Sequence, residues 1–458
     1  MNTTILETPS THDWRQSAKQ EQQYFLDEVD LYLQQYPETR EVDMFLHDLN
    51  GHIRGKRIDV SCLENLAQGC YFPASVYAMS LSGEVVKGCS ICNHIGEPDQ
   101  LCLPILGTLM PSASEPTTHA QLFLSMKEVD GSDCMFEPRN ILKHLLSQLH
   151  AAEYFPVMTG ELEFYLYPLT EGQEEVEVQC YDLEVLDQNL AILEQIKTFA
   201  AMQSIGVTGI VSESSLGQYE LNLQHSQDIL KLADHLLALR RIVKQIAQQH
   251  GRQASFMAKP SLERAGSGLH FHMSLLDAQV RNVFGLVDQE HPTPILTKIL
   301  AGLIDLMPAS MAILAPNINS FRRFQVGQHV PFEANWDSNN RDVAIRLPCS
   351  DDLNRRLEYR VAGADVNPYL AIAVIFIGML HGLKQDLALP AASHSVTVPD
   401  PLRMLPRNPL EALERFQQHP VLTHYLGERF MALWYDCKYY EYQKVQYQIT
   451  PMELQWGL

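Results

Sequence analysis

Residues 269–275 read LHFHMSL, a stretch in which apolar and polar side chains alternate. Such a period of two is typical of a β-strand, because residues two apart project on the same face. The stretches GELEF at 160–164 and RLEYR at 356–360 have the same spacing. Each of the three aims two functional side chains one way, so together they predict an active site floored by a β-sheet.

The acidic and histidine residues of these and nearby stretches are spaced to suit a magnesium cluster. The six candidate ligands are Glu161, Glu163, Glu213, Glu220, His270 and Glu358. Hard carboxylate oxygens with one imidazole suit Mg²⁺ or Mn²⁺ rather than structural zinc, and Mg²⁺ in such sites usually accompanies phosphate chemistry. A single ExE or HxH pair is more often an ordinary exposed strand face, so the prediction depends on these residues occurring together.

A run of arginines between residues 322 and 360 accompanies the candidate ligands. The chain has 55 acidic and 34 basic residues, so this basic segment is locally unusual. Guanidinium groups are planar donors suited to carboxylate and phosphate oxygens. The arginines are Arg322, Arg323, Arg341, Arg346, Arg355, Arg356 and Arg360. By themselves, the acidic cluster and these arginines would indicate a two-metal phosphohydrolase.

Further segments with recognisable motifs are spread along the chain. They are DLNGHIRGK (48–56), GELEF (160–164), ESSLGQYE (213–220), AKPSLERAGSGLHFHMSL (258–275), NSFRRF (319–324), NNRDVAIR (339–346), RLEYR (356–360) and NPYLA (367–371). Together these segments resemble the glutamine synthetase family. One such match would be weak evidence, but all of them in family order make the resemblance specific.

The resemblance implies an α+β glutamine-synthetase fold. It consists of a small N-terminal β-grasp domain and a large catalytic domain with an antiparallel sheet flanked by helices. We expect a helical segment at 1–36, the β-grasp domain at 37–130 and the catalytic domain at 131–458. Family members assemble as rings in which neighbouring subunits share active sites, so the expected state is a homo-oligomer, a dodecamer of two stacked hexamers.

The resemblance also implies how the cations are held. Glu161, His270 and Glu358 would bind the cation that bridges the nucleotide phosphates. Glu163, Glu213 and Glu220 would bind the one that faces glutamate. The expected cofactors are Mg²⁺ or Mn²⁺, two or three ions per active site, with ATP as co-substrate.

Further roles carry over to matched positions. Arg323, Arg360 and Gly266 would bind L-glutamate. The residues around the nucleotide would be His272, Ser274, Arg346 and Arg356. Arg341 would stabilise the phosphoryl group during its transfer, and Asp48, supplied by the adjacent subunit, would take a proton from the amine.

Three departures distinguish the chain from glutamine synthetases proper. Those enzymes have a glutamate in a flap loop at the position that His329 occupies in this chain, and Glu333 is the nearest carboxylate. Ala265 replaces an asparagine, and residues 383–402 contain no tyrosine that could match an adenylylation site. These features resemble the γ-glutamylpolyamine and γ-glutamylputrescine synthetase branch, and His329 becomes a candidate base.

The resulting prediction is a carbon–nitrogen ligase. It would join the γ-carboxylate of glutamate to a polyamine, putrescine or monoamine through γ-glutamyl phosphate, giving ADP and phosphate. No motif identifies the amine. One alternative is a glutamine synthetase that uses ammonium. Another is an inactive regulatory or structural member, which should have lost ligands that this chain retains.

Composition excludes several other classes. A net charge of −21 argues against a nucleic-acid surface. The N-terminus lacks the basic start and apolar core of a secretory signal. The longest apolar run, YLAIAVIFIGML at 369–380, is too short to span a bilayer and predicts a buried helix. We therefore expect a cytoplasmic protein that binds no membrane.

Overall fold

The structure, a computed structural model, describes residues 11–89, 91, 97–169, 180–287, 291–324, 330–395 and 400–456. Contacts divide the chain into two compact units that interleave along the sequence. The first is made of Met1–His47, Ile53–Val76 and Glu97–Cys134, and the second of Asp48–His52, Tyr77–Gly96 and Met135–Leu458.

The first unit contains a six-stranded sheet and the long helix α1 (Thr11–Gln35). Its strands are β1 (Glu41–His47), β2 (Ile53–Asp59), β3 (Cys70–Pro73), β4 (Asp99–Pro104), β5 (Met110–Pro111) and β6 (His119–Met126). The order is β2-β1-β6-β4-β3, with β5 paired to β6. The β1–β6 pair is parallel and the others are antiparallel.

Helix α1 belongs to this unit because one of its faces is apolar. Phe25, Val29 and Tyr32 follow helical spacing and are buried. Complete burial of a side chain such as Phe25 or Val29 contributes about 1.5–3 kcal/mol. The Glu28 carboxylate accepts the backbone N–H of Gly107 at 2.9 Å, which fastens the helix to the loop before β5. The predicted leading helix is thus present.

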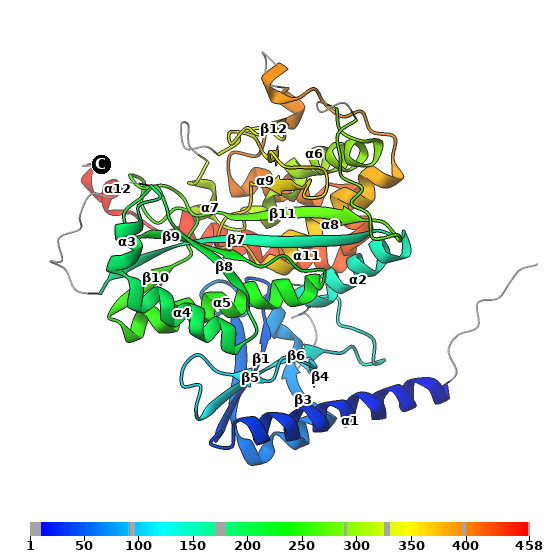
Figure 1. Ribbon diagram of the computed structural model, residues 1–458, viewed down its shortest axis with the longest axis vertical. Helices are drawn as coiled ribbons and strands as arrows, with labels where there is room; N and C mark the ends of the chain where they lie inside the picture. The colour runs from blue at the N-terminus through cyan, green and yellow to red at the C-terminus, as the bar shows by residue number, and fades with distance from the viewer. Residues whose placement is uncertain are drawn as a thin grey trace, which may run out of the picture. The chain divides into compact units, whose positions relative to one another are not determined.

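The second unit is built on an eight-stranded sheet. Its strands are β7 (Phe155–Pro168), β8 (Val207–Ser212), β9 (Gln218–Leu223), β10 (Arg252–Ser255), β11 (Leu269–Leu276), β12 (Trp336–Ser338), β13 (Ile345–Leu347) and β14 (Leu357–Tyr359). The order is β12-β13-β14-β11-β7-β9-β8, with β10 paired to β7. Figure 1 shows β7 and β11 side by side through the middle of this unit.

The sheet is mixed, which corrects the predicted antiparallel sheet. Strands β12 and β13 pair in parallel, whereas every other pair is antiparallel. The reason is that residues 339–344 carry the chain back to the start of β12 before β13 begins.

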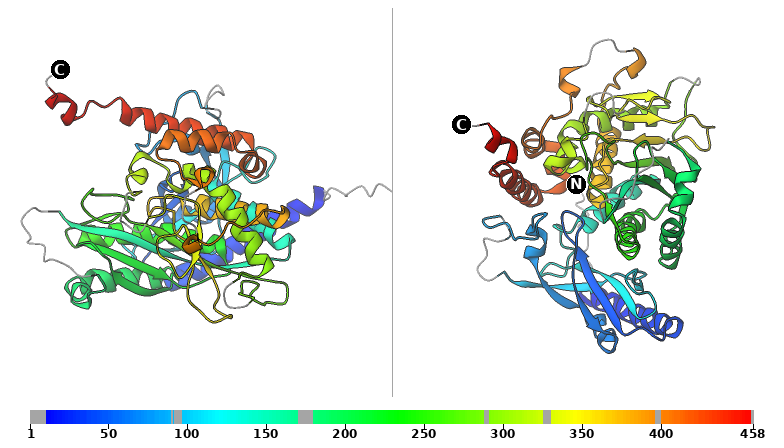
Figure 2. Two further views of the ribbon diagram at one scale, coloured as in Figure 1. Left: turned by 90° about the horizontal axis from the view of Figure 1, so that it is seen from above. Right: turned by 90° about the vertical axis from the view of Figure 1, so that its left-hand side faces the viewer.

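Helices of the second unit lie on the sheet and on one another. They are α2 (Pro138–Ala151), α3 (Leu183–Gln188), α4 (Leu190–Met202), α5 (Ile229–Gln249), α6 (Pro294–Leu314), α7 (Ile318–Phe321), α8 (Pro368–Lys384), α9 (Pro409–Gln417), α10 (Pro420–Leu426), α11 (Glu428–Gln446) and α12 (Pro451–Gln455). Helix α5 contacts β7 and β10, and α4 packs on α5. Figure 2 shows the long helix α11 leading to α12 near the C-terminus.

Helices α6 and α8 form the apolar centre of the second unit. The apolar run 369–380 lies within α8 and is buried there, as predicted. Helix α6 is long and apolar enough to cross a membrane, but 78% of its apolar window is buried inside the fold, as in the core helix of a soluble protein. The two helices approach closely at Gly302, where an added Cβ would lie 2.3 Å from the Gly378 carbonyl oxygen.

Candidate active site

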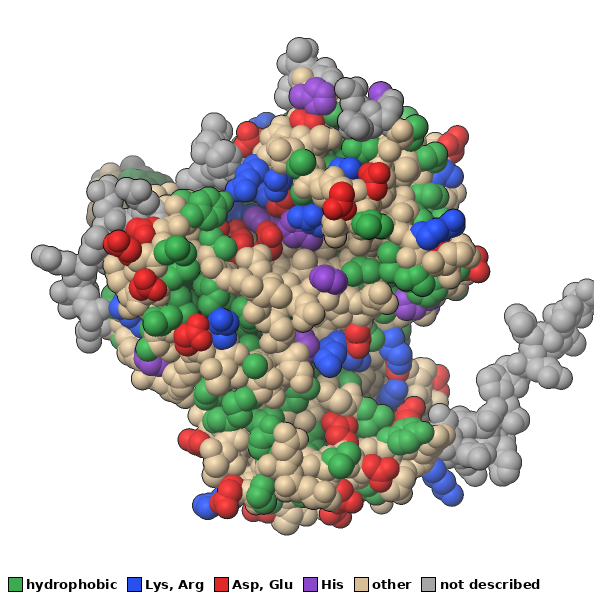
Figure 3. All heavy atoms as spheres, viewed as in Figure 1, with side chains coloured by type: hydrophobic (Ala, Val, Ile, Leu, Met, Phe, Trp, Pro, Cys, Tyr) green, Lys and Arg blue, Asp and Glu red, His purple; other side chains and the backbone are tan. Residues whose placement is uncertain are grey.

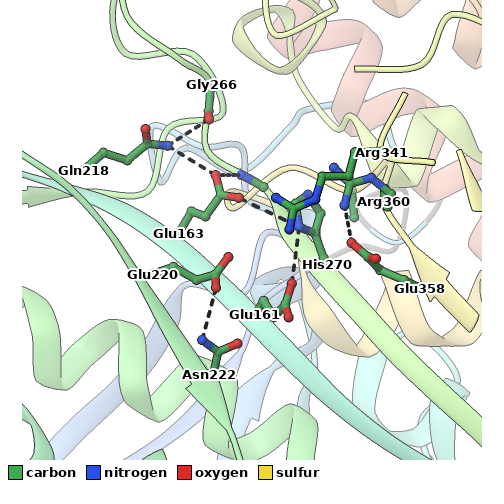
Figure 4. Close-up of polar contacts among 12 residues, drawn as sticks. Glu161, Glu163, Gln218, Glu220, Asn222, Gly266, His270, Arg341, Glu358 and Arg360 are labelled. Carbon is green, nitrogen blue, oxygen red and sulfur yellow. Dashed lines mark hydrogen bonds and ion pairs between the residues drawn. The ribbon is translucent and has the colours of Figure 1, made fainter. Parts of the chain in front are cut away.

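Strand register brings the predicted ligands together. His270 on β11 is paired with Glu161 on β7, and Glu163 is paired with Glu220 on β9. On the other side of β11, His272 is paired with Glu358 of β14. Because alternate residues share a face, these side chains converge, as Figure 4 shows for the labelled residues. The strands predicted from LHFHMSL, GELEF and RLEYR are confirmed.

These side chains line a pocket of about 540 Å³. Its lining residues are Glu161, Glu163, Cys180, Tyr181, Glu213, Ser214, Gln218, Glu220, Asn222, Ala265, Gly266, His270, His272, Arg323, Val330, Arg341, Arg346, Glu358 and Arg360. In the space-filling view of Figure 3, acidic, basic and histidine side chains gather in a hollow of the second unit. All six predicted cation ligands line the pocket.

Among the described residues, ligand atoms form two groups compact enough to hold a cation. Within each group the atoms lie within 4.8 Å of one another. The first group is Glu161, Glu220 and His270, and the second is Glu161, His272 and Glu358. The grouping differs from the predicted one because Glu161 belongs to both groups and His272, expected near the nucleotide, accompanies Glu358.

The carboxylates around β7 and β9 are crowded. Burial, together with the Glu213 charge, raises the pKa of Glu163 to about 7. Burial also raises the pKa of Glu220, and the charges of Glu161, Glu163 and Glu213 raise it further. A divalent cation would offset this repulsion and keep the groups ionised, so the donors present fit Mg²⁺ or Mn²⁺.

Two other carboxylates are stabilised as anions by neighbouring groups. Burial acts to raise the pKa of Glu161, but hydrogen bonds from His270 and His272 outweigh it and hold the pKa well below its usual range. The pKa of Glu358 is also lowered, because the Arg360 charge and the two histidines outweigh burial. Glu358 accepts from Arg346 Nη1 at 2.9 Å and also from Arg360.

The two histidines differ in surroundings. Burial lowers the pKa of His270 to about 4, so its imidazole is neutral near pH 7. His272 Nδ1 accepts a hydrogen bond from Arg356 Nε at 3.3 Å. Its Nε2 lies 2.8 Å from Glu161 Oε1.

Arg323, predicted to bind glutamate, is partly engaged by the protein itself. Its Nη1 donates to the carbonyls of Val361 at 3.0 Å and Ala362 at 3.1 Å, and its side chain is buried. A Cβ at residue 266 would lie 2.7 Å from Arg323 Cγ, so Gly266 is required for this close approach. Arg360 and Arg341 line the same pocket.

Four predicted residues lie elsewhere or outside the described chain. Ser274 and Arg356 are not among the residues that line the pocket in the described part of the chain. Neither is Asp48, a fully buried residue whose carboxylate accepts the backbone N–H groups of Asn50 and His52, both at 2.9 Å. His329 lies outside the described residues.

Glu333, the alternative to His329 in the predicted flap, does not line the pocket within the described chain either. Its carboxylate accepts from Arg403 Nε at 3.2 Å.

Several pocket residues were missed by the sequence analysis. Tyr181 accepts a hydrogen bond from Arg341 Nη1 at 3.1 Å, and nothing in its sequence context marked it. Asn222 donates to Glu220 Oε1 at 3.1 Å. Its position two residues after Glu220 was a signal, because strand spacing places both on one face. Gln218 donates to Glu163 and was likewise overlooked.

Comparisons with known proteins give a consistent result. The sequence model described as "Glutamine synthetase, catalytic domain" matches residues 135–457. The gamma-glutamylputrescine synthetase PuuA of Escherichia coli (strain K12) is 43% identical over 472 residues, covering 100% of this chain and 99% of that protein. A glutamate–isopropylamine ligase of Pseudomonas sp is 30% identical, covering 74% and 77%.

More distant similarities extend the same pattern. A glutamine synthetase of Thermus thermophilus is 26% identical, covering 88% of this chain and 95% of that enzyme. A solved structure of a GmaS/ADP complex superposes with a TM-score of 0.81 at 23% identity, covering 93% and 98% of the two chains. At 23% identity, the match to this solved structure establishes the fold of the chain.

Proposed function

The chain belongs to the glutamine synthetase family and is an ATP-dependent glutamate–amine ligase, and we propose that its amine substrate is putrescine or a similar aliphatic diamine. The observation that carries the proposal is the 43% identity to the Escherichia coli putrescine enzyme, which extends over the whole of this chain. The glutamine synthetase of Thermus thermophilus reaches only 26%. The negative net charge of −21 also favours encounter with a dication.

The reaction proceeds in two displacements. The γ-carboxylate oxygen of glutamate forms a bond to the γ-phosphorus of ATP, and ADP leaves. The amine nitrogen then attacks the acyl phosphate carbon, and phosphate leaves with the C–O bond electrons. An alkylamine is mostly protonated near neutral pH, so a base must first remove a proton. We assign that role to Asp48, with His329 as a second candidate.

The pocket residues have matching tasks in this proposal. Arg323, Arg360 and the backbone of Gly266 would orient glutamate, and Arg341 would stabilise the charge on the phosphoryl group. The residues proposed around the nucleotide are His272, Ser274, Arg346 and Arg356. Two or three divalent cations, Mg²⁺ or Mn²⁺, held by the six ligands would neutralise phosphate charge as the phosphate meets the glutamate carboxylate.

We further propose a homododecamer of two stacked hexamers located in the cytoplasm, where ATP is abundant. The family resemblance implies that the aspartate at position 48 acts in the active site of the neighbouring subunit, so a neighbouring copy would supply this base.

Phosphate release with ATP, Mg²⁺ and glutamate tests the proposal. The amine panel is ammonium, isopropylamine, ethanolamine, putrescine, spermidine and spermine, with Glu163→Gln as the inactive control. We expect putrescine to give the highest kcat/KM, and mass spectrometry to detect γ-glutamylputrescine. Turnover with ammonium alone would identify a glutamine synthetase, and preference for isopropylamine would identify a monoamine ligase.

A further inference from the structure

Gln218 connects a candidate cation ligand to the loop proposed to hold glutamate. Its Nε2 donates to Glu163 Oε2 at 3.2 Å and to the Gly266 carbonyl at 3.0 Å (Figure 4). The Gln218 side chain is buried, with 2% exposure, so water does not compete for these two bonds.

The Gln218 bond also determines which Glu163 oxygen is available to a cation. Oε2 of Glu163 accepts from Gln218 and from the backbone N–H of Gly268 at 2.8 Å. Oε1 lies 3.8 Å from His270 Nδ1, on the side of the other ligands. With Oε2 occupied by two donors, the carboxylate is oriented so that Oε1 faces the cation site.

The orientation of the Gln218 amide is itself defined by its partners. Both partners of Nε2 are oxygen acceptors, and Oε1 lies 3.3 Å from the Tyr165 hydroxyl. Turning the amide over would place Oε1 against the two acceptors, which costs both hydrogen bonds. The Tyr165 hydroxyl also donates to the Ala265 carbonyl at 2.8 Å, next to Gly266.

The backbone of Gln218 reaches a second candidate ligand. Its carbonyl accepts the N–H of Glu213 at 2.9 Å, and its own N–H donates to the Ser215 carbonyl at 2.9 Å. These bonds close the turn between β8 and β9. One residue thus contacts Glu163, Glu213 and Gly266.

We propose that Gln218 is a positioning residue that couples cation binding at Glu163 and Glu213 to glutamate binding at Gly266. This rests on the proposed function, which assigns Gly266 to glutamate. Ordering of Glu163 by a cation would order the loop through Gln218, and glutamate bound at the loop would order Glu163 in return. Such coupling between two binding equilibria is reciprocal.

Replacement of the amide by an apolar side chain of similar length tests the proposal. In Gln218→Met we expect Mn²⁺ affinity, measured by calorimetry on the full-length protein without turnover, to fall by about 10–100-fold. In the wild type, Mn²⁺ should increase the affinity for glutamate. In Gln218→Met we expect this increase to disappear, so that glutamate affinity is nearly the same with and without Mn²⁺. Wild-type Mn²⁺ affinity together with wild-type coupling would overturn the proposal.

Tyr165→Phe is the matched control. It removes the bond to the Ala265 carbonyl and the 3.3 Å contact with Gln218 Oε1, but the two acceptors of Gln218 Nε2 remain and still define the amide orientation. Mn²⁺ affinity should therefore stay within about twofold of wild type. An equal loss in both variants would indicate general loosening of the loop and would overturn the proposal.

Two further comparisons keep the outcomes separate. If Gln218→Met shows no cooperative thermal transition, Gln218→Asn replaces it, because the shorter asparagine amide cannot reach both acceptors. Wild-type Mn²⁺ affinity and wild-type coupling in Gln218→Asn would equally overturn the proposal. A wild-type protein that binds Mn²⁺ but neither binds glutamate nor turns over any amine would contradict the proposed function. The Mn²⁺ measurements would still decide whether Gln218 positions Glu163.

Discussion

Glu220 faces Glu163 directly across the β7–β9 pair, although like charges at such positions destabilise a sheet. Burial adds to the cost of each charge. Residues that weaken a fold in this way are retained where a site needs them, here for binding a divalent cation. Stability and activity should therefore respond in opposite directions to removal of one charge.

Glu220→Gln tests that trade-off. We expect amine-dependent phosphate release to fall by at least about 100-fold, because a cation ligand is lost. Burial and the neighbouring carboxylates raise the pKa of Glu220 to about 9, so folding at pH 8 requires this carboxyl to take up a proton. A neutral amide requires none and can still accept from Asn222, so the melting temperature of the metal-free protein at pH 8 should rise. The exposed Glu194→Gln is the control and should change neither quantity. A lower melting temperature for Glu220→Gln would show that repulsion is not the dominant effect.

At the residue scale, the period of two identified the side chains that share a face. It also marks Gln218, which lies two residues before Glu220 on β9 just as Asn222 lies two residues after it. It could not identify Tyr181 as a pocket residue, because its contact depends on chain segments that come together only in the fold. Arg341 meets Tyr181 across 160 positions of sequence, and no local pattern encodes such a pair.

The crossing of α6 and α8 shows how one small residue determines the distance between two elements. At Gly302 an added Cβ would lie 2.3 Å from the Gly378 carbonyl oxygen and 2.4 Å from the Gly382 nitrogen. Both obstacles are backbone atoms, so the helices themselves would have to separate.

We expect Gly302→Val to lower the free energy of unfolding by about 3 kcal/mol or to abolish soluble expression. Chemical denaturation measures the change. Lys298→Val places the same side chain elsewhere on α6 and should cost less than about 1 kcal/mol. Equal losses in the two variants would assign the effect to helix propensity.

At the element scale, apolar periodicity located the helices well. The apolar residues at 140–154, 189–206 and 227–251 have spacings near 3.6, which predict helices, and these occur as α2, α4 and α5 with ends shifted by a few residues. The parallel pair β12–β13 was not predictable, because strands of three residues are too short to show a period. Which helices cross each other, as α6 and α8 do, also has no sequence signature.

For the whole molecule, the crowded carboxylates predict how stability depends on pH. The pKa of Glu163 is raised from 4.5 to about 7, so its contribution is complete below pH 4.5 and is lost as pH rises through 7. The pKa of His270 is lowered from 6.5 to about 4, so its contribution is complete above pH 6.5 and is lost as pH falls through 4. Above pH 6.5 the His270 contribution no longer changes and only the Glu163 contribution does. The free energy of unfolding should therefore decrease as pH rises from 6.5 through 7.

Because Mg²⁺ binds the ionised carboxylates, the increase in melting temperature that it causes should be larger at pH 8 than at pH 6. Thermal melts at both pH values, with and without Mg²⁺, measure this difference. In Glu163→Gln the dependence on pH should be weaker. An equal Mg²⁺ effect at pH 6 and pH 8 in the wild type would contradict the prediction.

The proposed shared active site predicts complementation between inactive variants. Asp48→Ala and Glu163→Gln should each be inactive alone, because one lacks the amine base and the other a cation ligand. Co-expressed at equal levels, they should regain about a quarter of wild-type activity, since random assembly leaves that share of sites with neither change. Size-exclusion chromatography confirms mixed assembly, and activity no higher than that of the parents would exclude a shared site.

At this largest scale, sequence resemblance predicted the family and its two-part architecture, and both are confirmed. The interleaving of the two units could not be read from linear order. Residues 48–52 group with the second unit although strands of the first unit flank them on both sides.

Glu161 belongs to both ligand groups, and this has a practical consequence for handling the enzyme. The first ion to arrive would withdraw the negative charge of Glu161 from the second position, so the second ion would bind more weakly. Protein purified in magnesium-free buffer would then retain one ion and still need added salt for turnover. Metal analysis of a dialysed sample would find one ion where two can bind. The concentration of free magnesium that activity requires would then depend on the affinity of the weaker position alone.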